Sequence, residues 1–284
     1  MSEKFKLLQS YKKANKERRK KILSKSGYST ELEYVNHLQG NGASKEKAKT
    51  KTSKTSLADY VIAFDTTGSM ASYIGAVKKH VKGLIPTLFK DTPDLRVSIV
   101  AFGDYCDMKD KNTFGNAYQV CDLTNDENKL IKFVTEAKDT GGGDTDEFYE
   151  LVIKKITEET AWRNSSKRNV LFIGDCGPHP IGYSYSPNVV RNQIDWREEA
   201  KKAAKAGIQF DTLSIIGDSF YNQLAEITGG VCMPFSNASK TSQIVEASSA
   251  VRYSKEKFTT MYAMAVTDGD EELIGAYKSL SSLL

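Results

Sequence analysis

Residues 60–69 read YVIAFDTTGS, an apolar run followed by a carboxylate, a glycine and three hydroxyl side chains. The apolar run predicts a buried strand, and Gly68 permits a sharp turn into a helix. Because alternate side chains of an extended chain face the same way, Asp65, Thr67 and Ser69 converge at the carboxyl end of the strand. Oxygen ligands of this kind suit Mg²⁺, Mn²⁺ or Ca²⁺. The alternative is an ordinary turn and helix cap, which the same residue types also form.

Strands and helices alternate from this stretch to about residue 255. The segment 118–123 is short and flanked by polar residues, which predicts an edge strand antiparallel to its neighbour. The pattern predicts a doubly wound α/β fold, with a mostly parallel six-stranded sheet covered by helices on both faces. Ligands of such sheets bind at the carboxyl ends of the strands, beside the point where the strand order reverses. The expected strands are 60–64, 95–102, 118–123, 169–173, 208–216 and 231–235, and the expected helices are 70–88, 130–134, 148–156, 189–206, 220–227 and 242–251.

A chain of 284 residues, 39% of them hydrophobic, can bury one large core or two small ones, and one α/β domain with an appendage is the simplest fit. No apolar run has membrane-spanning length, and no apolar segment follows the basic N-terminus as in a secretory leader. The four cysteines lack CxxC spacing, which fits a reducing compartment. We therefore expect a cytoplasmic protein without a membrane span.

The charge is unevenly distributed along the chain. Residues 1–57 hold 15 Lys and Arg against 5 Glu, a net of +10, whereas residues 58–284 hold 25 against 31 acidic residues, a net of −6. The segment 45–57 is almost devoid of apolar residues, so it is predicted to be a flexible linker. The predicted organisation is a basic helical arm at 1–44, the linker at 45–57, an α/β domain at 58–255 and a C-terminal extension at 256–284.

The arm contains a dense basic cluster. One hypothesis is that the cluster contacts the phosphates of a nucleic acid, although the arm lacks interleaved aromatic residues and any groove-reading motif. The other is a solvated helix that docks on a protein partner or on its own domain. The residues concerned are Lys16, Arg18, Arg19, Lys20 and Lys21.

Two further loops are predicted to lie at the same edge of the sheet as Asp65. The loop 140–147 reads TGGGDTDE, where the glycines allow a tight fold and Thr145 presents a hydroxyl just as Asp146 and Glu147 open a helix. The loop 174–180 reads GDCGPHP and places Asp175 at the end of the strand beside that of Asp65. Together the three loops offer an oxygen-ligand set for a metal.

These residues resemble the metal-ion-dependent adhesion site of von Willebrand factor A domains, with Thr67 in place of the commoner Ser. The resemblance covers roughly residues 58–255, with its three motifs in order. Three short motifs are similar to those of intracellular A domains found beside alpha-type protein kinases and in bacterial regulatory systems. No kinase motif is present, so such an activity would belong to a partner. The motifs are Phe102-Gly103-Asp104-Tyr105, Gly143-Asp144-Thr145-x-Glu147 and Gly174-Asp175-x-x-Pro178-His179.

The resemblance implies a Mg²⁺ held directly by the hydroxyls of Ser69, Thr67 and Thr145, with Asp65 and Asp175 acting largely through bound waters. Carboxylates in the outer shell would leave the cation enough charge to attract an Asp or Glu of another protein. The expected function is a protein-interaction module, a regulatory or scaffolding subunit whose partner is an ATPase or a kinase.

Other residues near the predicted site have two readings each. One hypothesis is a partner-binding rim formed by Asp104, His179, Tyr183 and Tyr185. The alternative is that Asp104 belongs to a solvated loop, that His179 packs or bonds to loop backbone, and that the two tyrosines are packing residues. A Mg²⁺-dependent phosphoester hydrolase is the alternative function, but Thr67 stands where a phosphatase would carry its second aspartate. We therefore expect no catalysis.

The C-terminal extension contains apolar residues in two groups separated by the turn-like sequence at 267–270. It is predicted either to cover the domain or to insert into a partner. A homo-oligomer formed by insertion into a second copy of the chain is the remaining alternative.

Overall fold

Strand β1 (Ala58–Asp65) lies in the middle of a six-stranded sheet, and all of its residues are buried. The computed structural model describes residues 57–92, 94–110, 112–184, 192–215, 217, 219–234 and 238–284, with residues 11, 18, 19, 21, 22 and 35 nearer the N-terminus. A strand buried on both faces needs an almost continuous apolar sequence, and β1 has one.

The strand order is β3-β2-β1-β5-β7-β8, and every neighbouring pair is parallel except β2 with β3. The predicted sheet is therefore confirmed, including its antiparallel edge strand. The chain moves outward from β1 in one direction and then returns to add β5 on the other side, so the strand order reverses at β1. The remaining strands are β2 (Leu95–Phe102), β3 (Tyr118–Thr124), β5 (Lys167–Gly174), β7 (Ile208–Ser214) and β8 (Cys232–Pro234).

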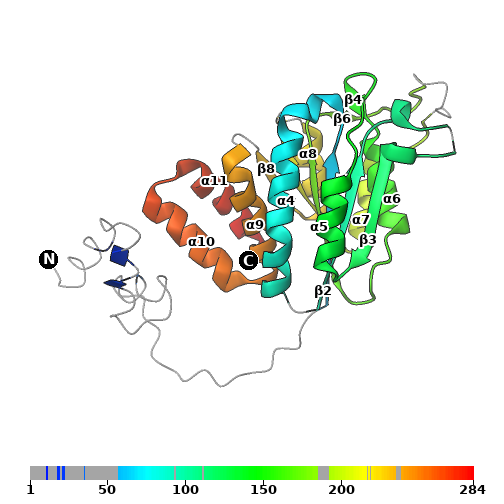
Figure 1. The fold of residues 1–284 in the computed structure, drawn as a ribbon. Coiled ribbons are helices and arrows are strands. Elements are labelled where there is room, and N and C mark those ends of the chain that lie inside the picture. Colours follow the sequence, from blue (N-terminus) through cyan, green and yellow to red (C-terminus); the bar gives the residue numbers. More distant parts are fainter. Residues whose placement is uncertain are drawn as a thin grey trace.

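Helices cover both faces of the sheet (Figure 1). One layer contains α4 (Ala71–Asp91), α5 (Glu127–Glu136) and α9 (Ala238–Tyr253), and the other contains α6 (Tyr149–Glu159), α7 (Trp196–Lys205) and α8 (Ser219–Thr228). Short elements at the loops are η1 (Gly68–Met70), η2 (Tyr105–Asp107), η3 (Gly115–Ala117), β4 (Asp146–Glu147), β6 (Gly177–Pro178) and η4 (Ser281–Leu283).

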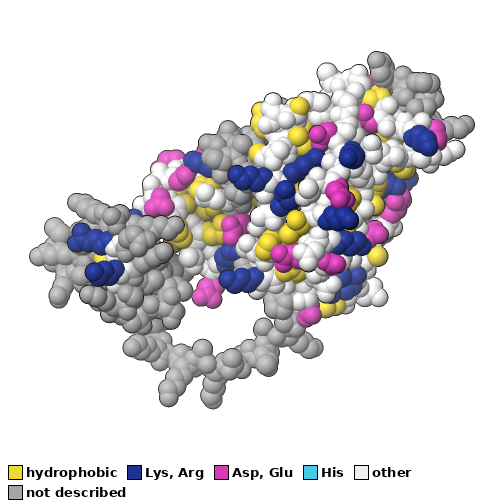
Figure 2. All heavy atoms as spheres, in the orientation of Figure 1, with side chains coloured by type: hydrophobic (Ala, Val, Ile, Leu, Met, Phe, Trp, Pro, Cys, Tyr) yellow, Lys and Arg dark blue, Asp and Glu magenta, His cyan; other side chains and the backbone are white. Residues whose placement is uncertain are grey.

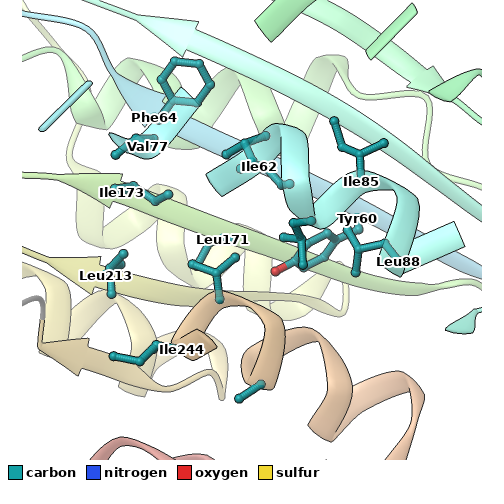
Figure 3. Close-up of a cluster of buried hydrophobic side chains, with 14 of the residues drawn as sticks. Tyr60, Ile62, Phe64, Val77, Ile85, Leu88, Leu171, Ile173, Leu213 and Ile244 are labelled. Atoms are coloured by element: carbon teal, nitrogen blue, oxygen red, sulfur yellow. The ribbon is translucent and has the colours of Figure 1, made fainter. Parts of the chain in front are cut away.

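The core consists of two apolar clusters separated by the sheet. Successive residues of β1 alternate between them, with Ile62 in one cluster and Val61 and Ala63 in the other. Figure 3 shows the first cluster, where side chains from the strands meet side chains from α4 and α9. Its labelled members are Tyr60, Ile62, Phe64, Val77, Ile85, Leu88, Leu171, Ile173, Leu213 and Ile244.

The helix predicted at 189–206 begins later than expected. Residues 192–195 are not helical, residues 185–191 lie outside the described part of the chain, and α7 starts at Trp196. Asp195 is the N-cap, since its Oδ1 accepts a hydrogen bond of 2.9 Å from the backbone N of Arg197. Capping by an aspartate satisfies a backbone N–H that no earlier turn of the helix could satisfy.

The C-terminal extension covers the domain. It forms α10 (Lys255–Asp268) and α11 (Glu271–Leu280), which pack against α9 and extend the first apolar cluster. Phe258 and Tyr277 are almost completely buried, and their rings meet at 6.0 Å between centroids. Of the alternatives considered from the sequence, this packing favours the covering role.

The described part of the basic arm includes Arg18, Arg19 and Lys21, all helical, whereas Lys16 and Lys20 lie outside the described residues. Arg19 Nη1 lies 3.4 Å from Asp268 Oδ1 at the end of α10. On the face of the domain in Figure 2, acidic and basic side chains are interspersed. This face therefore lacks the uniform basic surface typical of nucleic-acid binding. Among the described helices, none is both long and apolar enough to cross a membrane.

The amino end of β1 is fixed by a buried ion-pair network around Asp59. Its carboxylate is fully buried and accepts hydrogen bonds from Arg96 Nε at 3.0 Å, Arg163 Nε at 2.9 Å and Ser166 Oγ at 2.9 Å. Arg96 and Arg163 come from β2 and from the loop before β5, so one carboxylate joins three neighbouring segments.

Replacing Asp59 by Asn leaves two guanidinium groups without their shared carboxylate. We expect the free energy of unfolding to fall by about 3 kcal/mol at neutral pH, as for other buried ion pairs that lose one partner. Urea denaturation measures the loss, and Asp122→Asn, at an exposed position of β3, is the matched control. An unchanged unfolding midpoint in Asp59→Asn contradicts the proposed role.

The ion-pair network around Asp59 also makes the stability of the fold depend on pH. Burial alone would raise the pKa of Asp59, but hydrogen bonds from Arg96, Arg163 and Ser166 hold it below its usual value. A carboxyl group with a lowered folded pKa adds stability above its unfolded pKa of about 3.9 and loses it as the pH falls through the folded value. The difference in the free energy of unfolding between wild type and Asp59→Asn should therefore shrink when the urea titrations are repeated from about pH 5 down to about pH 2.

Candidate metal centre

The candidate site lies at the carboxyl ends of β1 and β5, where the strand order reverses. Three loops meet there, and backbone hydrogen bonds join the first two. Gly68 N donates to Gly141 O at 3.1 Å, and Thr140 N donates to Thr66 O at 2.9 Å. The turn after β1 is therefore fixed against the glycine-rich loop.

Four of the five predicted metal residues form one hydrogen-bonded chain. Asp65 Oδ1 accepts from the backbone N and from Oγ1 of Thr67, each at 2.7 Å. Thr67 Oγ1 lies 3.2 Å from Ser69 Oγ, which donates to Asp175 Oδ1 at 2.9 Å. Asp65 and Thr67 are buried, Asp175 is half-buried and Ser69 is exposed, so the chain of oxygens runs from the interior to the surface.

Thr145 is exposed and takes no part in this chain. Glu147 lies beside the chain of hydrogen bonds, since a Cβ added at Gly142 would be 2.8 Å from Glu147 Oε1 and 3.4 Å from Thr67 Cβ. Glu147 is 2% exposed, and its Oε2 has no hydrogen-bond partner within the described residues. The sequence reading that Asp146 and Glu147 open a helix is wrong, because they form β4 and α6 begins at Tyr149.

Burial shapes the ionisation of both interior carboxyl groups. Burial raises the pKa of Asp65 to about 7, although hydrogen bonds from Thr67 and Tyr149 act in the opposite sense. Burial and repulsion from Asp65 and Asp104 raise the pKa of Glu147 to about 10. Ionising these groups in the interior is costly unless a positive charge compensates them.

A hard divalent cation fits these residues. The donors are hydroxyl and carboxylate oxygens, which Mg²⁺ prefers, and a buried carboxylate oxygen of Glu147 has no hydrogen-bond partner among the described residues. Cys176 Sγ lies 3.3 Å from Asp175 Oδ1. Burial raises the pKa of its thiol, which favours the neutral form while no metal is bound.

Tyr149 holds the interior end of the site, which the sequence did not reveal. Its hydroxyl donates to Asp65 Oδ2 at 2.5 Å and accepts from the backbone N of Cys176 at 3.3 Å. The ring is fully buried against Phe102 and Phe172. Tyr149 thus connects the carboxylate after β1 to the loop after β5.

Two of the predicted rim residues are buried beneath the surface. Asp104 is 0% and His179 2% exposed, and Asp104 Oδ1 lies 2.7 Å from His179 Nε2. The half-buried Tyr183 stacks on His179 at 3.6 Å between ring centroids. Neither Asp104 nor His179 therefore offers a surface to a partner, contrary to the expectation of an exposed rim. Tyr185 lies outside the described residues.

The fold and the oxygen cluster at the strand ends define a class of protein. Residues 59–250 match the family model of the von Willebrand factor type A domain. The chain belongs to this family.

Solved structures with a similar fold have little sequence in common with the chain. The pilus adhesin SpaC of Lactobacillus rhamnosus GG, in its open conformation, aligns with a TM-score of 0.54 and 12% identity over 74% of this chain and 31% of the adhesin. The SpRpn10 VWA domain gives a TM-score of 0.46 and 16% identity over 66% of this chain and 95% of that domain. BatB of Bacteroides thetaiotaomicron, a conserved hypothetical protein, gives a TM-score of 0.46 and 14% identity over 67% of this chain and 96% of BatB.

The chain thus corresponds to less than a third of the adhesin's length. A comparison with curated proteins finds no match.

Gly174, at the end of β5, has no room for a side chain. A Cβ there would collide with the hydroxyl of Tyr149 and lie 2.8 Å from that of Tyr221. We expect Gly174→Ala to lower the free energy of unfolding by about 1–3 kcal/mol, as in other overpacked cores. Adding Tyr149→Phe removes the colliding hydroxyl and should restore part of the loss in a double-mutant cycle.

The matched control is Gly75→Ala on α4, where an added Cβ meets nothing within 4 Å. Alanine favours a helix over glycine, so this variant should be neutral or more stable. If the double variant is as unstable as the sum of its parts, Tyr149 does not restrict Gly174.

Proposed function

We propose that the chain is a protein-interaction module that binds an acidic side chain of a partner through a Mg²⁺ held at the candidate metal centre. The observation that carries the proposal is the hydrogen-bonded series Asp65, Thr67, Ser69 and Asp175, which brings two carboxylates and two hydroxyls together and reaches the surface at Ser69. Mn²⁺ or Ca²⁺ would suit the same oxygen donors.

Thr67 and Ser69 would hold the ion through their hydroxyls, with Asp65, Asp175 and Glu147 as the nearby carboxyl groups. Thr145 is exposed in the glycine-rich loop, and we retain it as a third hydroxyl ligand. The bound ion supplies a positive charge that attracts a carboxylate. Because exposure increases from Asp65 to Ser69, the partner approaches from the side of Ser69.

The proposed role is binding without catalysis. His179 pairs with Asp104 and contacts neither Thr67 nor Ser69, so it does not activate their hydroxyls as nucleophiles. The motifs shared with A domains beside alpha-type kinases support a regulatory or scaffolding subunit, with an ATPase or kinase as partner. The four cysteines are free thiols, which supports a cytoplasmic site of action.

The test begins with Mg²⁺ alone. Calorimetric titration of Mg²⁺ into EDTA-treated protein should show one bound ion in the wild type and a large loss of affinity in Ser69→Ala. Ser69 is exposed, so this variant should keep its fold, and Ser72→Ala at an exposed position of α4 is the matched control. Equal Mg²⁺ affinity in Ser69→Ala and Ser72→Ala contradicts the metal site.

The acidic ligand is tested by selecting peptides from a random library on the Mg²⁺-loaded protein. Selected peptides should carry Asp or Glu, and replacing that residue by Asn or Gln should abolish binding, as should EDTA. Peptides that bind equally well in EDTA would falsify the metal-dependent mode.

The interior hydrogen bond to Asp65 gives a further expectation. Tyr149→Phe should weaken Mg²⁺ binding by about 10–100-fold, the usual effect of losing a partner that orients a ligand. Tyr221→Phe is the control, because this neighbouring tyrosine is fully buried and its hydroxyl has no hydrogen-bond partner in the described structure. The same Mg²⁺ affinity in both variants contradicts the positioning role of Tyr149.

A further inference from the structure

A second group of charged side chains lies at the same edge of the sheet. Asp104 follows β2, Asp144 belongs to the glycine-rich loop and His179 follows β6. One potential ligand atom from each residue lies within 4.8 Å of the others. Three segments distant in sequence therefore bring two carboxylates and an imidazole together.

Three buried carboxyl groups lie in and around this group. Asp104 and Glu150 are fully buried and Glu147 is 2% exposed. Among the described residues, no lysine or arginine forms an ion pair with any of them. Within the described part of the chain, the one basic side chain in contact is that of His179, whose Nε2 lies 2.7 Å from Asp104 Oδ1. The backbone N of His179 also donates to Glu150 Oε2 at 3.1 Å. Uncompensated carboxylates are costly in the interior.

Asp104 also has an unused ligand atom. Its Oδ1 faces His179, but its Oδ2 is buried and has no hydrogen-bond partner within the described residues. Buried polar atoms are normally paired, so an orphan oxygen beside a carboxylate and an imidazole points to a missing positive ligand.

We propose that Asp104, Asp144 and His179 form a second cation site, which takes a divalent transition-metal ion such as Zn²⁺. The imidazole nitrogen distinguishes this group from the all-oxygen candidate metal centre, because nitrogen donors favour Zn²⁺ and its neighbours over Mg²⁺. Three protein ligands leave one position of a tetrahedral ion for water.

The observed geometry is close to what such an ion needs. Two ligands that each lie about 2.1 Å from a tetrahedral ion are about 3.4 Å apart, compared with 2.7 Å between Asp104 Oδ1 and His179 Nε2. The ion would fit if Asp104 Oδ1 and His179 Nε2 moved slightly apart and released the proton between them. Asp144 is exposed and provides the entrance from solvent.

Tyr183 orients this group from outside. Its hydroxyl donates to Asp144 Oδ2 at 2.8 Å, and its ring stacks on His179 with an interplanar angle of 12°. Such outer contacts fix ligands and tune metal affinity in known sites. The tyrosine predicted to form a partner-binding rim thus acts as a positioning residue in the proposed site.

The test uses the full chain, treated with EDTA and then saturated with Mg²⁺ to occupy the first centre. Titration with Co²⁺, followed by its visible absorption, should show one further ion per chain, displaced by Zn²⁺. His179→Gln and Asp144→Asn should each weaken Co²⁺ binding by more than about tenfold, and Tyr183→Phe by about 10–100-fold. Mg²⁺ affinity should stay unchanged in all three variants.

Two controls separate this site from other binding. His80→Gln changes a histidine of α4, outside these loops, and should leave Co²⁺ binding intact. Ser69→Ala should affect Mg²⁺ but not Co²⁺, so a failure of the proposed function is distinguishable from a failure of this inference. Because His179 is buried, Asp144→Asn at an exposed position keeps the test valid if His179→Gln unfolds. Absence of a second ion, or wild-type Co²⁺ affinity in Asp144→Asn, overturns the proposal.

Discussion

The carboxylate of Asp65 is fully buried at the end of the central strand, and the surrounding loops are arranged around it. Thr67 satisfies one oxygen and Tyr149 the other. These two bonds fix the turn that leads to Ser69 and the loop that carries Asp175, because the same tyrosine also accepts from Cys176 N. The positions of Ser69 and Asp175 therefore depend on how one interior carboxylate is held.

The same arrangement explains why two positions in these loops are glycines. Gly174 must lack a side chain because the hydroxyl of Tyr149 occupies that space, and Gly142 leaves room for Glu147 beside Thr67. Gly142 also has a positive φ of 71°, which a residue with a Cβ adopts at a cost. The glycine-rich sequence is thus explained by close approach as much as by turn formation.

The sequence was sufficient to predict the sheet, because strands buried on both faces need long apolar runs and the intervening helices have a distinct period. It also placed Asp65 and Asp175 together, since parallel strands end at a common edge. It did not predict Tyr149, whose position in an amphipathic helix resembles that of any core aromatic residue. Glu147 belongs to one of the motifs quoted from the sequence, but it was not predicted as a site residue, because an acidic residue near the start of a helix is normally a surface residue.

The burial of Asp104 and His179 was equally inaccessible from the sequence. Polar residues in loops are usually solvated, and only the meeting of the loops after β2 and β6 encloses this pair. The aromatic cover depends on Tyr183, which is distant from Asp104 in sequence and stacks on the histidine in the fold. Long-range enclosure of this kind has no local sequence signal.

Strand β1 carries a buried carboxylate near each end, and the two are compensated differently. Asp59 receives its positive charge from arginines of the same chain, whereas Asp65 has no basic side chain among its hydrogen-bond partners. Under the proposed function, a change in the concentration of free divalent ion would act at the Asp65 end of the strand. The Asp59 end, whose charge is balanced by two arginines, would keep the strand in place at any concentration of that ion.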